Sequence, residues 1–202
     1  MTRTVVVDAC ALSREALDGA AAVLGGGGLV VFPTESFYGL GADARNPQAI
    51  ARVFSVKRRP GAKPLLVLVA SIAMVETLVT DLPGGARDLM TRHWPGPLTL
   101  VLKAEAGLPS ALTAGTDTVG VRMPGHPIAL ALVRAAGFPV TAPSANPSDE
   151  PPPTTALAAR RYFEERVELI LDGGPTAGGA GSTIVDCTAW PPRVLRHGPV
   201  QV

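Results

Sequence analysis

The chain has 202 residues, a length that suits one domain with a substantial core and is short for two. Hydrophobic residues make up 47% of the chain and charged residues 17%, a balance that excludes an intrinsically disordered protein. The formal net charge is +1, whereas a large RNA-binding face leaves a basic excess, so we expect any nucleic acid to be met through a partner or one small patch.

The N-terminal part of the chain alternates strand and helix signals. Two apolar runs are typical of buried strands, at 5–8 and 29–32. Between them, Ser13 is placed to cap a helix over 14–24, which the glycine run 25–28 ends. Asn46 precedes Pro47, which suits the first position of a second helix.

The same alternation continues to the C-terminus. Strands are expected at 65–69, 98–102, 119–123, 139–142, 168–171 and 182–186. Helices are expected at 72–79, 86–93, 128–136 and 154–165. This order predicts an α/β fold, with a twisted, mostly buried sheet and helices packed on it. No linker or repeat interrupts the chain, so we expect a single domain over residues 1–202.

The sequence points away from membranes and secretion. The most apolar stretch, Leu65 to Val75, is far shorter than the roughly 20 residues that a membrane-spanning helix needs. The N-terminus shows no apolar core followed by a small-residue cleavage site. Cys10 and Cys187 form no CxxC motif, so we expect two free thiols in a reducing cytosol, and a cytoplasmic protein.

The first candidate for chemistry is the segment FPTESFYGLGADA at 32–44. It places polar residues, among them Ser36, directly after an apolar strand. In open α/β sheets such positions often line a ligand crevice. The alternative is an ordinary polar turn whose glycines supply positive φ angles.

The second candidate is KRRPGAKPLLV at 57–67, which holds four cations: Lys57, Arg58, Arg59 and Lys63. Cations that end a helix can simply interact with its dipole, which is the alternative here. Pro60 and Gly61 nevertheless shape the loop between the helix and the next strand, and such a cluster suits a polyphosphate.

Four weaker segments follow. In TDTVGVRMPGHP, Arg122 lies in a strand-like run, so it must face solvent, a carboxylate or a ligand. VTAPSANPS carries Ser144 and Asn146, which can hold a nucleotide or cap the next helix. GSTIVD at 181–186 opens a strand with Ser182, and VLRHGPV places Arg196 after an apolar pair.

Other sequence signatures of chemistry are missing. The sequence has no GxxxxGK[ST], GxGxxG or GxSxG motif, and the glycine-rich run 173–181 lacks a lysine. The three histidines have no ligand spacing, so no metal site from protein side chains is identified. Hydroxyls and cations without an evident acid-base pair suit the binding and positioning of anions.

Taken together, the six segments resemble the YrdC-like family of threonylcarbamoyl-AMP synthases. PTESFYGLG is similar to the family's PTET-x-YGLG, and KRRPGAKPL to its K-x-RP-x-x-[KN]-PL. TVGVRMP, APSAN-x-S, STIVD and LR-x-G follow in the family's order and spacing. The resemblance covers about residues 13–202 and implies a single-domain α/β twisted sheet with a deep, positively charged cavity.

The resemblance also implies an activity: conversion of L-threonine, bicarbonate and ATP to threonylcarbamoyl-AMP and pyrophosphate, for the threonylcarbamoyladenosine modification of tRNA. The L-threonine contacts that it implies are Ser36, Arg122, Ser144 and Ser182. The ATP contacts that it implies are Arg59, Lys63, Thr118, Asn146, Thr154 and Arg196. Catalysis is assigned to Lys57, Arg59 and Lys63, with Mg2+ as the cofactor. The expected partners are these substrates and the downstream tRNA threonylcarbamoyl-transfer machinery, with at most a weak RNA contact and no membrane.

Some positions depart from the family pattern. Ser36 replaces a threonine and keeps its hydroxyl. Leu68 stands where some members have a substrate-touching histidine, and Asp149 where many have a glycine. The extra C-terminal domain of two-domain members is not expected here.

Two other functions stay open. One is the carbamoyl-adenylate domain of a carbamoyltransferase, which shares the fold. The other is a non-catalytic RNA-binding module that uses the basic cavity.

Overall fold

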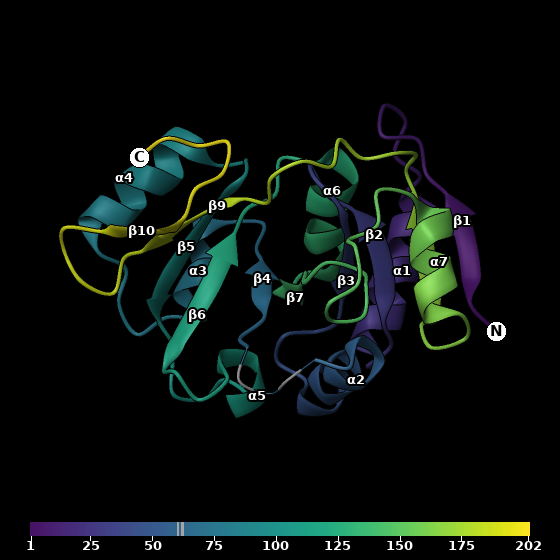
Figure 1. The fold of residues 1–202 in the computed structure, drawn as a ribbon, viewed down its shortest axis with the longest axis horizontal. Coiled ribbons are helices and arrows are strands. Elements are labelled where there is room, and N and C mark those ends of the chain that lie inside the picture. Colours follow the sequence, from purple (N-terminus) through teal and green to yellow (C-terminus); the bar gives the residue numbers. More distant parts are fainter. Residues whose placement is uncertain (60, 62) are drawn as a thin grey trace.

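The strands form two sheets, each covered by helices (Figure 1). The computed structural model describes residues 1–59, 61 and 63–202, so the predicted part of Pro60 in shaping the cationic loop lies outside the described residues. The first sheet, sheet A, has the order β1 (Arg3–Val6), β8 (Leu169–Asp172), β2 (Val30–Pro33), β3 (Tyr38–Gly41). The second, sheet B, has the order β10 (Arg193–Arg196), β9 (Thr183–Asp186), β5 (Leu98–Lys103), β6 (Thr118–Arg122), β4 (Leu66–Leu68), β7 (Val140–Thr141).

The helices pack around both sheets. They are α1 (Arg14–Gly25), α2 (Pro47–Lys57), α3 (Ile72–Glu76), α4 (Gly84–His93), α5 (Ser110–Thr113), α6 (Pro127–Ala136) and α7 (Ala156–Phe163). The helices α1 and α6 pack against each other beside sheet A, whereas α4 packs on β5 of sheet B. None of the helices in the described part of the chain is both long and apolar enough to cross a bilayer.

The predicted starts of α1 and α2 are confirmed in detail. The Ser13 hydroxyl accepts a hydrogen bond from the Ala16 amide, and the Asn46 side chain accepts from the amides of Gln48 and Ala49. Both side chains satisfy amides that the first helical turn leaves without intrahelical partners. Pro47 occupies the first helical turn, as its fixed φ and missing N–H predict.

The predicted α/β class is confirmed, with the strands divided between two sheets. Most apolar runs mark buried strands correctly, but the run at 5–8 does not: β1 spans Arg3–Val6 at the edge of sheet A and is largely exposed. The runs also do not say which strands pair. One element that the apolar pattern does not predict is β3, because Gly39 and Gly41 interrupt its hydrophobic run. A Cβ at Gly41 would lie 2.8 Å from the ring of Phe32, so only glycine fits against this neighbouring strand. FPTESFYGLG is therefore a β-hairpin, with Pro33 paired to Tyr38 across the turn.

The two sheets meet where β3 approaches the loop that follows β7. The Leu40 amide donates to the carbonyl of Pro143 at 2.8 Å, and the Ala145 amide donates to the carbonyl of Tyr38 at 2.7 Å. These bonds fix Ser144 beside the hairpin and bring polar segments far apart in sequence to one place.

Candidate active site

A cavity of about 440 Å3 lies between the hairpin of sheet A and the strands of sheet B. Seven of the eleven predicted site residues line it: Ser36, Arg59, Thr118, Arg122, Ser144, Ser182 and Arg196. The wall also includes Thr34, one of the polar residues of the segment 32–44, and Thr99, which the sequence did not single out. The cavity therefore combines three guanidinium groups with several short hydroxyl side chains.

Arg122 is the most deeply buried of the three arginines, with a side chain only 5% exposed. Its terminal nitrogen Nη2 lies 3.7 Å from the Glu35 carboxylate, and its Nε has no hydrogen-bond partner among the described residues. Burial lowers the pKa of Arg122, Glu35 raises it, and Arg196 lowers it. A buried guanidinium with an unused N–H at a cavity wall is suited to an anionic ligand group.

Arg196 and Ser182 form one unit at the sheet B side of the cavity. The Arg196 guanidinium donates to the Ser182 carbonyl at 3.0 and 2.7 Å and to its hydroxyl at 3.2 Å. The hydroxyl of Thr99 lies 2.7 Å from that of Ser182. These contacts fix the direction of both side chains, and burial lowers the pKa of Arg196.

Arg59 is oriented by the cationic loop itself. Its Nε donates to the carbonyl of Lys63 at 3.1 Å, and its Nη2 donates to the carbonyl of Pro64 at 2.9 Å. Lys63 is exposed and lies outside the cavity wall, so the structure does not bring its side chain together with Arg59 at the cavity.

Lys57 differs from Arg59 in its surroundings, because its ammonium is engaged by backbone carbonyls of the loop after β7. Lys57 is only 2% exposed and lies outside the cavity wall. Its Nζ donates to the carbonyls of Ser144 and Asn146, both at 2.5 Å. Burial lowers the pKa of Lys57 to about 7, and the charge of Arg59 acts in the same direction. The lysine therefore holds the loop that carries Ser144 and does not reach into the cavity.

Asn146 and Thr154 also lie outside the cavity wall. The Asn146 amide group donates to the carbonyls of Pro147 and Glu150, at 3.0 and 2.6 Å. Its Oδ1 is buried and has no partner among the described residues. Thr154 is half-buried just before α7, and its carbonyl accepts from the Thr176 amide at 2.9 Å.

Leu68 and Asp149, two of the three positions that depart from the family pattern, have different structural settings. Leu68 is fully buried on β4, opposite Arg122 and Val140 in register, so the core occupies this position. Asp149 has φ +71°, in the left-handed region that favours glycine. Aspartate tolerates this region better than most residues, so the turn is kept without a glycine.

Glu35 is a residue whose contacts the sequence did not predict. Its Oε1 accepts from the Gly125 amide at 2.6 Å, and its Oε2 is buried without a hydrogen-bond partner among the described residues. Glu35 belongs to the hairpin of sheet A, whereas Gly125 and Arg122 belong to β6 and the loop that follows it. Glu35 thus links the two sheets at the cavity. Its position between Thr34 and Ser36 in the polar motif was the available signal.

Comparisons with known proteins show the family of the chain. The Sua5/YciO/YrdC family model, described as telomere recombination, matches residues 22–198. The chain is 48% identical to a threonylcarbamoyl-AMP synthase of Pyrococcus abyssi over 172 residues, covering 85% of this chain and 51% of the relative. It is 45% identical to a threonylcarbamoyl-AMP synthase of Bacillus subtilis over 182 residues, covering 90% of this chain and 53% of the relative.

The fold of the chain is also similar to that of a solved structure. The crystal structure of P. abyssi Sua5 complexed with L-threonine matches with a TM-score of 0.93 and 44% identity, over 96% of this chain and 57% of that chain. The chain spans about half the length of the curated relatives described above. The family model covers most of the chain, and the fold agrees throughout the matched part. The chain therefore belongs to the Sua5/YciO/YrdC family.

Proposed function

We propose that this chain is an L-threonylcarbamoyladenylate synthase, a nucleotidyltransferase that converts L-threonine, bicarbonate and ATP to threonylcarbamoyl-AMP and pyrophosphate. The observation that carries the proposal is the cavity wall, in which Arg59, Arg122 and Arg196 stand among short hydroxyl side chains. The names of the two relatives and the threonine complex of P. abyssi Sua5 support it. The product would supply the tRNA threonylcarbamoyl-transfer machinery in the cytoplasm.

The proposed reaction has two steps. The threonine amine and bicarbonate combine to a carbamate with loss of water. A carbamate oxygen then attacks the α-phosphorus of ATP, the bond to the β-phosphate oxygen breaks, and pyrophosphate leaves. Both reactants of the second step are anionic, so the first requirement is neutralisation of charge by fixed cations.

The residues of the cavity divide between the two substrates. Arg122, with its unused buried N–H, would bind the threonine carboxylate. The hydroxyls of Ser36, Ser144 and Ser182 would orient the rest of the amino acid. The proposed ATP contacts in the wall are Arg59, Thr118 and Arg196. Lys63, Asn146 and Thr154 remain proposed ATP contacts, which requires that the bound nucleotide extends beyond the wall.

Mg2+ is the proposed cofactor, and the chemistry of the residues decides how it would be held. Among the described residues, no three His, Cys, Asp or Glu side chains gather where they could hold a metal ion. Glu35 is already engaged with the Gly125 amide and faces Arg122. These residues fit an ion that arrives on the phosphate oxygens of ATP, as is usual for Mg2+. When bound there, it would neutralise phosphate charge.

Positioning is the second contribution of this chain. Arg122 is fixed by burial and Arg196 by its bonds to Ser182, so neither must be ordered at the moment of reaction. Holding two reactants in line can supply roughly 7–11 kcal/mol of the barrier. The arrangement suits a reaction that depends on alignment more than on acid-base chemistry.

The test is incubation with ATP and bicarbonate, with and without L-threonine, followed by mass spectrometry of the adenylate and assay of pyrophosphate. Threonylcarbamoyl-AMP should form only when all three substrates are present. Pyrophosphate release without an amino acid would point to the carbamoyl-adenylate alternative. Steeply salt-dependent RNA binding without ATP turnover would favour the RNA-binding module.

A further inference from the structure

The glycine-rich run 173–181 has no place in the proposed mechanism so far. It leaves β8 in sheet A and reaches β9 in sheet B, and Figure 1 shows it as the yellow-green segment that crosses between the two sheets. At its start, the Tyr38 hydroxyl donates to the carbonyl of Gly174 at 2.6 Å. At its end, Gly181 lies directly against the Arg196 guanidinium. The run is therefore anchored on both sides of the cavity.

The middle of this run contacts the turn that carries Ser36. The Thr176 hydroxyl donates to the carbonyl of Ser36 at 2.8 Å, and the Gly178 amide donates to the same carbonyl at 2.7 Å. Two donors on one carbonyl use both of its lone pairs. The backbone of Ser36 is thereby fixed from outside the hairpin.

The conformation of the run explains why a glycine stands at position 178, two residues after Thr176. Gly178 has φ +68°, and a Cβ there would lie 3.3 Å from the Thr154 side chain. Thr176 is held in turn, because its amide donates to the Thr154 carbonyl at 2.9 Å. Thr176 thus joins the Ser36 turn to the residue that precedes the N-cap of α7.

We propose that Thr176 is a positioning residue of the amino-acid subsite, which acts by fixing the backbone of Ser36 so that the Ser36 hydroxyl stays at the cavity wall. This rests on the proposed function, since it takes Ser36 as a threonine contact. Thr176 itself lies outside the cavity wall, so it touches no substrate directly.

The test compares Thr176→Val, which removes the hydroxyl at nearly constant shape, with Thr176→Ser, which keeps it. Thr176→Val removes the short hydrogen bond to the Ser36 carbonyl and a longer one, of 3.3 Å, to the Thr154 carbonyl. Loss of the first should raise the KM for L-threonine about two- to tenfold, with a smaller change in kcat. Thr176→Ser should keep the parent KM. Thr77→Val is the matched control, because the Thr77 hydroxyl also donates to a carbonyl at 2.8 Å but does so at the end of α3.

A double-mutant cycle distinguishes positioning from general loosening. If Thr176 acts through the Ser36 hydroxyl, Thr176→Val should have no further effect on the threonine KM in a Ser36→Ala background. Additive effects, or a parent-like KM in Thr176→Val, would overturn the proposal.

One readout does not depend on activity. The Gly178 amide should exchange with solvent faster in Thr176→Val than in the parent or in Thr176→Ser, because the shared carbonyl loses its second anchor. Unchanged exchange would overturn the inference, even if the parent made the adenylate. If the Gly178 amide exchanged faster in Thr176→Val but the parent made no threonine-dependent adenylate, the proposed function would be refuted and the contact would stand.

Discussion

The carboxylate of Glu35 lies 3.7 Å from the guanidinium of Arg122 and supplies the negative charge beside the most buried cation of the cavity. The two groups come from different sheets, and their side chains are 22% and 5% exposed. A pair in this setting differs from the surface pairs of the chain, because water cannot replace the partner that is removed.

Glu35→Gln should therefore lower the free energy of unfolding by about 1–3 kcal/mol, since Arg122 loses its counter-charge while the Gly125 amide keeps an acceptor. Glu76→Gln is the matched control. Glu76 lies only 2.6 Å from Arg87, but both side chains are nearly half exposed. This exposed pair should contribute less than about 1 kcal/mol. Urea denaturation measures both, and an equal loss for the two variants would contradict the role of burial.

Lys57 predicts a pH dependence of stability. Its folded-state pKa of about 7 is below its ordinary value of 10.5, so the unfolded state binds more protons between these values. The contribution of Lys57 to stability should therefore rise with pH above 7, by at most about 1.4 kcal/mol per pH unit.

The matched variant is Lys57→Met, which leaves the carbonyls of Ser144 and Asn146 without their donor. It should be less stable than the parent by about 1–3 kcal/mol at pH 7, and the difference should widen toward pH 9. Denaturant titrations at several pH values measure this difference in the free energy of unfolding. If the difference did not change with pH, the pKa of Lys57 would not be lowered in the folded protein.

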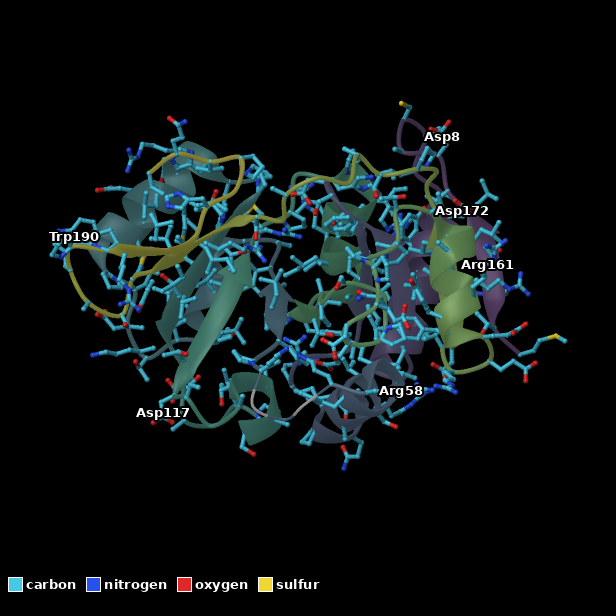
Figure 2. All side chains as sticks on the ribbon, viewed as in Figure 1. Asp8, Arg58, Asp117, Arg161, Asp172 and Trp190 are labelled. Carbon is cyan, nitrogen blue, oxygen red and sulfur yellow. The ribbon has the colours of Figure 1, made fainter. Side chains whose placement is uncertain are left out.

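Arg59 should matter more for turnover than its neighbours in the cationic loop. Loss of a fixed cation facing developing charge typically lowers the rate by about a hundredfold or more, which we expect for Arg59→Ala. Lys63→Ala should lose less, because Lys63 is exposed outside the wall. Arg58→Ala is the control, since the Arg58 side chain lies at the surface beside α2 (Figure 2) and should change the rate less than about twofold. Equal rates for Arg59→Ala and Arg58→Ala would exclude Arg59 from the phosphate site.

The amino-acid subsite should prefer L-threonine to L-serine. One methyl group in a fitted pocket is worth about 1–3 kcal/mol, so serine should have a kcat/KM about 10- to 200-fold lower. Pyrophosphate release with each amino acid measures the ratio. Equal kcat/KM values would mean that the cavity does not enclose the side chain of its substrate.

Lys57 and Arg59 show where the sequence is informative and where it is not. Both have the residue type that a phosphate site needs, and they are two positions apart. Between them, Arg58 has φ +48°, in the left-handed region, and the chain changes direction. Lys57 consequently points under the loop after β7, whereas Arg59 reaches the cavity wall. The residue types can be read from the sequence, but the different directions of the Lys57 and Arg59 side chains depend on how α2 packs.

The strands could also be predicted only in part from the sequence. The strand patterns at 29–32, 98–102 and 182–186 predicted β2, β5 and β9 at nearly their observed bounds. The pattern does not predict β10, because most of its residues are exposed. The division into two sheets depends on which strands become neighbours over long distances in sequence, and hydrophobic pattern alone does not encode that choice.

The order of strands in sheet A has a consequence for synthesis of the chain. β8 pairs with both β1 and β2, although about 135 residues separate β2 from β8. Until residues 169–172 have emerged from the ribosome, β1 lacks its neighbour and β2 has only the hairpin strand β3 beside it. Contacts this distant in sequence slow folding. The nascent chain therefore cannot complete sheet A until β8 has been synthesised, however early β1, β2 and β3 emerge.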